Sequence, residues 1–295
     1  MQELKIMRNK MSEDIKLGLH NISNEEYHSS PGLSRSALMQ FKKSPYHYWH
    51  SYLKPDKTRQ TPSEAMVLGE LVHTLVLEPL SFQDRYIMTE HIDRRTKAGK
   101  EHYASVLENA KEKGVTVINS DLYARAYEMR QSLQNNPEIN SVLSKQELNI
   151  EKSIYFKDER ADVLCKARPD GFNCNFALDL KTSRDASYNA FQRQAVSSGY
   201  YLQAGMIKIA LKSIGCDIDN FIFIVVENRE PYATATYIMH QEALEYGMNQ
   251  FYELVANYKL CSEMNRWPGY AAKELTVPRF AMYDEIDDID IDIEQ

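Results

Sequence analysis

The sequence predicts a mixed α/β fold in which a β-sheet lies between helices. Three observations predict it. Stretches with helical apolar periodicity alternate with short runs of β-branched and aromatic residues. The middle of the chain, from about 148 to 181, is a series of such short runs separated by turn residues, which indicates a meander of strands. At 295 residues and 43% hydrophobic, the chain can bury a substantial core.

The first part of the chain predicts helices. Ser34 is a plausible N-cap for a short amphipathic helix that stops before Pro45. A second, largely buried helix is expected from about 65 to 76, because its apolar residues recur at helical spacing before Pro79. We therefore expect a helical lead-in over 1–60, followed by a larger domain over 61–283.

The rest of the chain alternates between helices and strands. Between 96 and 145, two polar-faced helices are expected to flank a short strand at Val115–Ile118. Further strands are expected at 148–157, 161–168, 176–181, 220–227 and 232–239. Further helices are expected at 186–213, with an interruption at Ser198-Gly199, and at about 241–263.

The formal net charge of −7 at first argues against a nucleic-acid-binding protein. The segment 284–295, however, contains seven acids and no bases. Without this acidic tail, the acids balance the 35 Lys and Arg residues. A neutral body can still hold a basic groove, although composition alone does not reveal one. The tail is expected to be solvated or docked peripherally, because it has no core of its own.

Targeting signals and cysteine usage favour the cytoplasm. No apolar run is long enough for a transmembrane helix, and the N-terminus lacks the apolar region of a secretory signal. The four cysteines are too few and too scattered for a disulfide framework, so we expect core thiols in a reducing compartment. They include no C-x₂-C pair, and no iron–sulfur cluster is expected.

The pattern that points to chemistry is Arg168-Pro169-Asp170, then eight residues, then Asp179-Leu180-Lys181. Side chains alternate along a strand, so Asp179 and Lys181 should project from one face while Leu180 points into the core. If 161–170 and 176–182 form an antiparallel hairpin, Asp170 can lie near Asp179. Two carboxylates facing one point suit Mg²⁺ or Mn²⁺, and a neighbouring lysine could orient a water toward a phosphodiester.

An ordinary structural explanation competes with this one, because Asp-x-Lys occurs often by chance on edge strands. Two facts favour chemistry. The charges lie inside an apolar strand, Ala177–Lys181, where unpaired ions would be costly. The same alternation puts Lys166 and Arg168 on the face of Asp170, where they would bind phosphate.

These residues resemble a known family. Pro169-Asp170…Asp179-Leu180-Lys181 is similar to the signature of PD-(D/E)xK nucleases. The wider string CKARPDGF…ALDLKTS, with NISNEEYHSSPGLSRSALMQFKKSPYHYW and AMVLGELVHTLVLEP before it, resembles the RecE-type phage and prophage exodeoxyribonucleases (exonuclease VIII), a RecB-like branch. The resemblance covers roughly residues 20–260. It implies a restriction-endonuclease-like core with a mixed sheet flanked by helices and preceded by a helical extension.

The resemblance also implies roles for individual residues. His73, in a Gly-x-x-x-His helix, would be a metal ligand. Asp170 would bridge or ligate metal, and Asp179 would ligate the catalytic metal together with the Leu180 carbonyl. Lys181 would position the nucleophilic water.

Further residues are implied around this centre. Gln203 matches the helix glutamine that RecB-like nucleases place beside the site, and Glu151 falls where such folds often supply another acid. Tyr200 and Tyr201 are expected to contact DNA. The sequence departs from the family at Tyr201, where histidine is usual, and at Ile207, where relatives commonly have tyrosine.

The activity that the resemblance implies is a Mg²⁺-dependent exonuclease that digests double-stranded DNA ends 5′ to 3′ and leaves 3′ single strands. Family members form rings around the duplex, so a homo-oligomeric ring and a single-strand annealing protein are the expected partners, with no membrane. Two alternatives remain open. One is an endonuclease or Cas4-like exonuclease of the same fold, and the other is a non-catalytic DNA-binding module on that fold.

Overall fold

The computed structural model describes residues 15–54, 62–89, 95–144 and 147–278. Its central sheet consists of β4 (Asn149–Ile150), β7 (Gly171–Phe172), β8 (Phe176–Ser183), β9 (Asn220–Glu227) and β10 (Thr234–Met239). The strand order is β10-β9-β8-β7-β4. β8 and β9 are parallel, and the other neighbours are antiparallel. The sheet is therefore mixed, and the predicted α/β class is confirmed.

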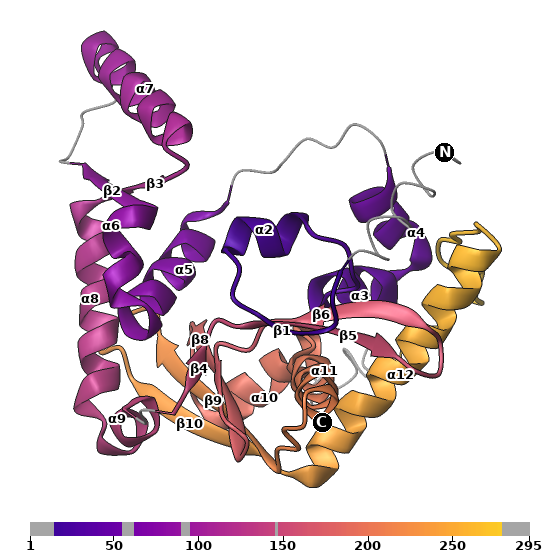
Figure 1. The fold of residues 1–295 in the computed structure, drawn as a ribbon. Coiled ribbons are helices and arrows are strands. Elements are labelled where there is room, and N and C mark those ends of the chain that lie inside the picture. Colours follow the sequence, from indigo (N-terminus) through magenta and orange to yellow (C-terminus); the bar gives the residue numbers. More distant parts are fainter. Residues whose placement is uncertain (1–14, 55–61, 90–94, 145–146, 279–295) are drawn as a thin grey trace, which may run out of the picture.

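Helices cover both faces of this sheet (Figure 1). One face packs against α5 (Glu64–Leu77), α8 (Ser120–Asn135) and α9 (Pro137–Leu143). The other packs against α10 (Tyr188–Ser197), α11 (Tyr200–Ser213) and α12 (Gln241–Glu263). The alternation along β8 decides which side chain enters which layer: Leu178 and Leu180 pack with the first group and Ala177 with the second. The interruption predicted at Ser198-Gly199 separates α10 from α11, and Gly199 has a positive φ of 70°.

A smaller antiparallel sheet lies beside the central one. It has the order β1-β5-β6 and consists of β1 (Gly18–His20), β5 (Ser153–Asp158) and β6 (Val163–Ala167). The predicted hairpin between 161–170 and 176–182 is therefore wrong: β6 pairs with β5, and β8 pairs instead with the short strand β7. Pro169 explains the break between β6 and β7, because proline has no N–H to donate to a ladder.

The N-terminal segment packs on the second layer of helices. It contains α2 (Asn24–Ser29), α3 (Arg35–Lys43), α4 (Pro45–Tyr48) and the π-helix η1 (Trp49–Leu53). Ser34 caps α3, as predicted, by accepting a hydrogen bond from the amide of Ala37 at 3.3 Å. Leu38 and Phe41 belong to the same core cluster as Phe251 of α12. This lead-in therefore shares its core with the rest of the protein.

A peripheral unit follows α5. It comprises η2 (Pro79–Ser81), α6 (Phe82–Arg85), the parallel strands β2 (Tyr86–Thr89) and β3 (Thr116–Asn119), and α7 (Lys97–Glu112), which projects away from the central sheet (Figure 1). The acidic tail at 284–295 lies outside the described residues. Among the helices that the structure describes, none combines the length and the apolar character needed to cross a membrane.

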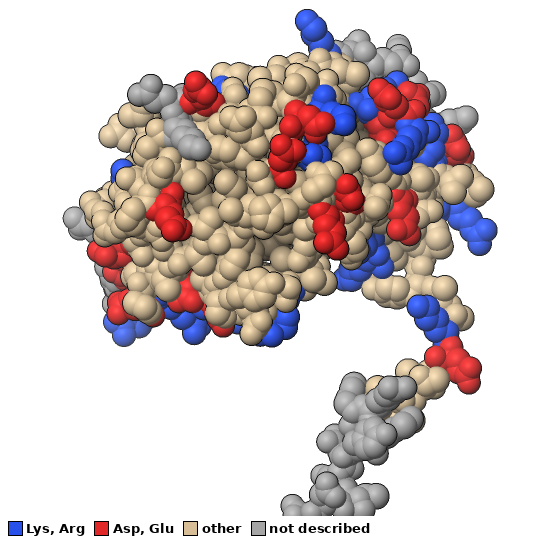
Figure 2. Space-filling view, turned by 90° about the horizontal axis from the view of Figure 1, so that it is seen from below, with Lys and Arg blue, Asp and Glu red and all other residues tan. Residues whose placement is uncertain are grey.

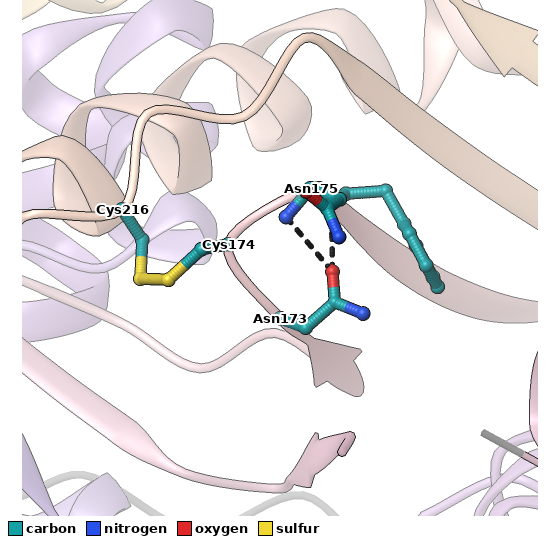
Figure 3. The surroundings of a disulfide bond; sticks show 5 residues. Asn173, Cys174, Asn175 and Cys216 are labelled. Carbon is teal, nitrogen blue, oxygen red and sulfur yellow. Dashed lines mark hydrogen bonds between the residues drawn. A yellow bond between two sulfur atoms is a disulfide. The ribbon is translucent and has the colours of Figure 1, made fainter. Parts of the chain in front are cut away.

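A disulfide joins Cys174, in the turn before β8, to Cys216, in the loop after α11 (Figure 3). In the same turn the Asn173 side chain accepts hydrogen bonds from the amides of Asn175 at 2.9 Å and Phe176 at 3.1 Å. The expectation that all cysteines are core thiols is therefore wrong for this pair. Their Cα atoms lie 4.6 Å apart although 42 residues separate them in sequence, so linear spacing could not reveal the pairing. Cys165 and Cys261 are free thiols.

Candidate active site

The candidate site lies at the point where the ladder beside β8 ends. β9 pairs with the whole length of β8, but on the other edge β7 pairs only with Ala177 and Leu178. Beyond that point two side chains replace the missing strand. The amide of Leu180 donates to Asp170 Oδ2 at 2.7 Å, and the carbonyl of Leu180 bonds to His73 Nε2 at 2.6 Å. The backbone of β8 thus anchors two of the predicted metal ligands.

His73, Glu151 and Asp170 converge at one point. One potential ligand atom from each lies within 4.8 Å of the other two. A carbonyl oxygen only accepts hydrogen bonds, so the bond to Leu180 requires His73 Nε2 to carry a hydrogen. In a neutral ring Nδ1 then has a lone pair, and it faces Asp170 Oδ2 at 3.4 Å. Two electron-rich atoms in this position suit a shared cation.

The two carboxyl groups of this cluster resist ionisation. Burial, together with the charge of Asp170, raises the pKa of Glu151 to about 8. Burial, together with the charge of Asp179, raises the pKa of Asp170 to about 6, although His73 and Lys181 oppose the shift. A bound cation would offset both causes, because it stabilises the charged form of each acid. Two carboxylates and one imidazole nitrogen form a donor set that fits a divalent metal.

Glu151 reaches this cluster through an unusual backbone conformation. Its φ is +50°, in the left-handed region that residues other than glycine rarely adopt. The residue separates β4 from β5, and its amide donates to the carbonyl of Asp170 at 3.1 Å. The prediction put Glu151 inside one continuous strand, from 148 to 157. The structure instead divides that strand at the acid, as is common where a functional group must be aimed.

A second group lies on the face of β8 that carries α11. Asp179 is fully buried and forms an ion pair with Lys181, so the predicted projection of both side chains from one face is confirmed. The amide nitrogen of Gln203 donates to the other carboxylate oxygen of Asp179. Gln203 Oε1 is buried and has no hydrogen-bond partner among the described residues. Three of the four predicted catalytic residues therefore contact one another directly.

Lys166 does not lie in this group. Strand alternation predicted that it shares the face of Asp170, but its ammonium donates to the carbonyls of Tyr27 at 2.5 Å and Ser30 at 2.6 Å and to Ser30 Oγ at 3.2 Å. Burial lowers its pKa to about 8. The predicted phosphate contact would require Lys166 to exchange these partners.

Arg168 also binds the N-terminal segment. Its guanidinium donates to the carbonyl of Ile22 at 2.8 Å and to Ser153 Oγ at 2.7 Å, and it lies 4.5 Å from the centre of the Tyr27 ring. β6 ends at Ala167, so the alternation used for the prediction stops one residue earlier. Lys166, Arg168 and Gln203 nevertheless all line one cavity of about 1260 Å³.

The two tyrosines predicted to contact DNA differ in exposure. Tyr200 is only 6% exposed, and the Lys181 ammonium lies 4.9 Å from its ring centre. Tyr201 is half-buried and packs edge-on against Tyr246. The contact between Tyr200 and Lys181 was not predicted from the sequence. The spacing of Tyr200 and Gln203 was the available signal, because residues three apart share one helix face.

Comparison with known proteins shows the family of the chain. A family described as a PDDEXK-like domain of unknown function (DUF3799) matches residues 34–275, a range that includes every site residue named above except those of the N-terminal segment. No curated protein matches the chain in sequence.

A solved structure shares the overall fold. A "putative exonuclease" from Eubacterium rectale superposes with a TM-score of 0.55 at 12% identity and covers 90% of this chain and 100% of its own. A phage-related exonuclease from Haemophilus somnus (TM-score 0.32, 14% identity, 57% of this chain and 85% of that one) and an alkaline exonuclease from Laribacter hongkongensis (0.23, 13%, 66% and 97%) superpose too loosely to support an argument.

Proposed function

Because the chain belongs to the family of PDDEXK-like domains, we propose that it is a nuclease that hydrolyses DNA phosphodiester bonds with a divalent cation. The observation that carries the proposal is the convergence of His73, Glu151 and Asp170 beside the Asp179–Lys181 pair. Buried acids with raised pKa values ionise readily only beside a positive charge. The cation proposed is Mg²⁺, which Mn²⁺ can replace, because oxygen ligands dominate the set.

Each residue has a role in this proposal. His73, Glu151 and Asp170 hold the cation, and Asp179 completes its ligands. The Leu180 carbonyl joins them when the cation replaces the hydrogen bond that this carbonyl accepts from His73 Nε2. When bound, the cation supplies positive charge to the scissile phosphate. Lys181 orients the attacking water through its ammonium. Gln203 holds the Asp179 carboxylate in place by its hydrogen bond. Because Lys181 is paired with this carboxylate, Gln203 also helps to keep the Lys181 ammonium near the metal ligands.

We propose that the substrate is an end of double-stranded DNA, digested 5′ to 3′ so that a 3′ single strand remains. The support is the resemblance to RecE-type exonucleases over roughly residues 20–260. We extend the proposal to a homo-oligomeric ring around the duplex, a single-strand annealing protein as partner, and a role in phage-type recombination. A DNA substrate of this kind would place the activity in the cytoplasm.

The path of the DNA is proposed to follow the cavity that Gln203 borders. Lys166 and Arg168 line this cavity and would bind phosphate there. Tyr201 would contact the strand beside Gln203. The face shown in Figure 2 is a poor alternative, because acidic and basic side chains are interspersed on it. A DNA backbone is bound best by an uninterrupted basic surface.

The test is digestion of linear duplexes labelled at the 5′ or 3′ end, and of closed circular duplexes, with Mg²⁺ or with EDTA. The proposal predicts loss of linear DNA only, release of 5′ label first, and no reaction in EDTA. Cleavage of circular DNA would instead support an endonuclease. Binding of duplex without any cleavage, at every concentration of Mg²⁺ and Mn²⁺ tried, would support a non-catalytic module and overturn the proposal.

A further inference from the structure

The ring of Tyr200 lies against the ammonium of Lys181. The nitrogen is 4.9 Å from the ring centre, within the range of an attractive contact between a cation and an aromatic face. Because Tyr200 is only 6% exposed, its ring meets this lysine inside the protein. We propose that Tyr200 is a positioning residue, whose ring holds the Lys181 ammonium beside Asp179. This inference rests on the proposed nuclease function of the site.

Tyr200 is itself held rigidly. Its ring stacks on Phe223 of β9 at 5.4 Å between centres and packs on Phe191 of α10 at 5.6 Å. Its hydroxyl accepts a hydrogen bond from the side-chain amide of Gln194 at 3.0 Å. Gln194 in turn accepts a hydrogen bond from Ser183 Oγ, at the end of β8, at 2.8 Å. The ring is thus fixed to the same sheet that carries Lys181.

Such a support is needed because lysine is a flexible chain with about 2 kcal/mol of rotamer entropy. Asp179 attracts the ammonium, but the same carboxylate is a proposed ligand of the cation. A ligand that shares its charge with a divalent ion attracts a lysine less strongly. The Tyr200 ring is neutral and does not bind the ion in competition. It can therefore keep Lys181 in place in the loaded enzyme, when the attraction of Asp179 is weakest.

Three substitutions test the inference: Tyr200→Leu, Tyr200→Phe and, as the matched control, Phe251→Leu. Phe251 is also buried, and its ring packs on Phe156 at 5.9 Å and on Tyr252 at 5.6 Å, outside the group of rings that holds Tyr200. Leucine removes the aromatic face, whereas phenylalanine keeps it. For Tyr200→Leu we expect kcat to fall about tenfold, with unchanged KM for the duplex and an unchanged Mn²⁺ midpoint. Tyr200→Phe should stay within about twofold of wild type, and so should Phe251→Leu, even where its Tm falls as far as that of Tyr200→Leu.

A second measurement is independent of activity. In metal-free protein, the change in Tm caused by Lys181→Met should be smaller in the Tyr200→Leu background than in wild type, because the two side chains interact. If wild-type protein does not cleave DNA, the nuclease proposal is contradicted. The Tm changes of Lys181→Met in the two backgrounds can still be compared. Additive changes in Tm would overturn the contact. A raised KM with normal kcat in Tyr200→Leu, or equal defects in the Phe and Leu variants, would overturn the positioning role and favour a DNA contact.

Discussion

The buried acids on the two sides of strand β8 have different surroundings. On the side of α5, Glu151 and Asp170 are forced together with His73, and both acids have raised pKa values. On the side of α11, Asp179 is even more deeply buried, but Lys181 and Gln203 occupy both of its oxygens. In the proposed mechanism the first side supplies most of the ligands of the cation, while on the second side Asp179 completes the ligands and holds Lys181 beside them.

The cost of burying acids with raised pKa values falls on the α5 side. A buried acid without a partner destabilises the folded protein, whereas a paired one is tolerated. The first side adds a second cost, since Glu151 adopts a backbone conformation that side chains disfavour. The protein therefore concentrates its strain at the proposed metal cluster. Variants that alter either side should separate metal binding from the chemical step.

The largest effect is expected on the α11 side. Asp179→Asn keeps the shape of the side chain but removes the charge that holds Lys181. We expect cleavage to fall by about 1,000-fold, the upper range for loss of a group that acts on the transition state. Asp158→Asn is the control: Asp158 is also buried, and its carboxylate accepts from the Ala161 amide at 2.8 Å, away from the site. Equal losses in the two variants, measured as kcat/KM on linear duplex, would contradict the assignment.

A somewhat smaller loss is expected for Lys181→Met, which keeps the length of the chain without its ammonium. Cleavage should fall by about 100-fold, while duplex binding changes little. Tm should also fall, because the substitution leaves the buried Asp179 carboxylate without its ion-pair partner. Lys208→Met is the control, since Lys208 is a buried lysine that bonds to the carbonyl of Ile218 and to Asp217, in the segment after α11. Retention of more than about a tenth of wild-type activity by Lys181→Met would exclude Lys181 from the chemical step.

On the α5 side, His73→Ala should act through the cation. The apparent affinity for Mn²⁺ is expected to fall by about tenfold to a hundredfold, so excess Mn²⁺ should restore part of the activity. His47→Ala serves as the control, because His47 bonds to Ser44 Oγ at 2.6 Å within the N-terminal segment. If the Mn²⁺ titration of His73→Ala matches that of wild type, His73 is not a metal ligand. Its role would then be structural, through its hydrogen bond to the Leu180 carbonyl.

The smallest effect concerns the pH dependence of stability without metal. Glu151 and Asp170 bind protons more tightly in the folded protein than in the unfolded chain, whose carboxyl pKa values are near 4. Their stabilising contribution is therefore complete below about pH 4 and is lost as pH rises through about 6 and about 8. In EDTA, Tm should fall between pH 5 and 9 more steeply for wild type than for Glu151→Gln. Parallel curves would show that Glu151 titrates normally.

Much of this comparison could be predicted from the sequence. Alternation alone put Asp179 and Lys181 on one face with Leu180 in the core, and the local pattern predicted the helix that carries Gln203. The place of Gln203 beside the site was implied only by the family resemblance. The PD-(D/E)xK fold is confirmed by the family match and the shared architecture. These predictions succeeded because they depend on short-range periodicity within one strand or helix.

The contacts that could not be predicted depend on where strands end. The chain is interrupted at Pro169, and β6 belongs to a separate sheet with β5. Lys166 and Arg168 therefore bond to carbonyls of the N-terminal segment. The shortness of β7 leaves Leu180 free to bond to His73, and no local pattern reveals this. The pairing of Cys174 with Cys216 likewise depends on the approach of β8 to the end of α11.

In the proposed mechanism His73, Glu151 and Asp170 form a metal site whose acids are partly protonated until the cation binds. This is tested by calorimetric titration of Mn²⁺ into metal-free protein at pH 7, in two buffers of different ionisation enthalpy. We expect saturable binding with release of protons, because Glu151 has a pKa of about 8 before binding. In Asp170→Asn both the binding and the proton release should be lost. Binding of Mn²⁺ to Asp170→Asn with wild-type affinity, or binding to wild type without proton release, would contradict it.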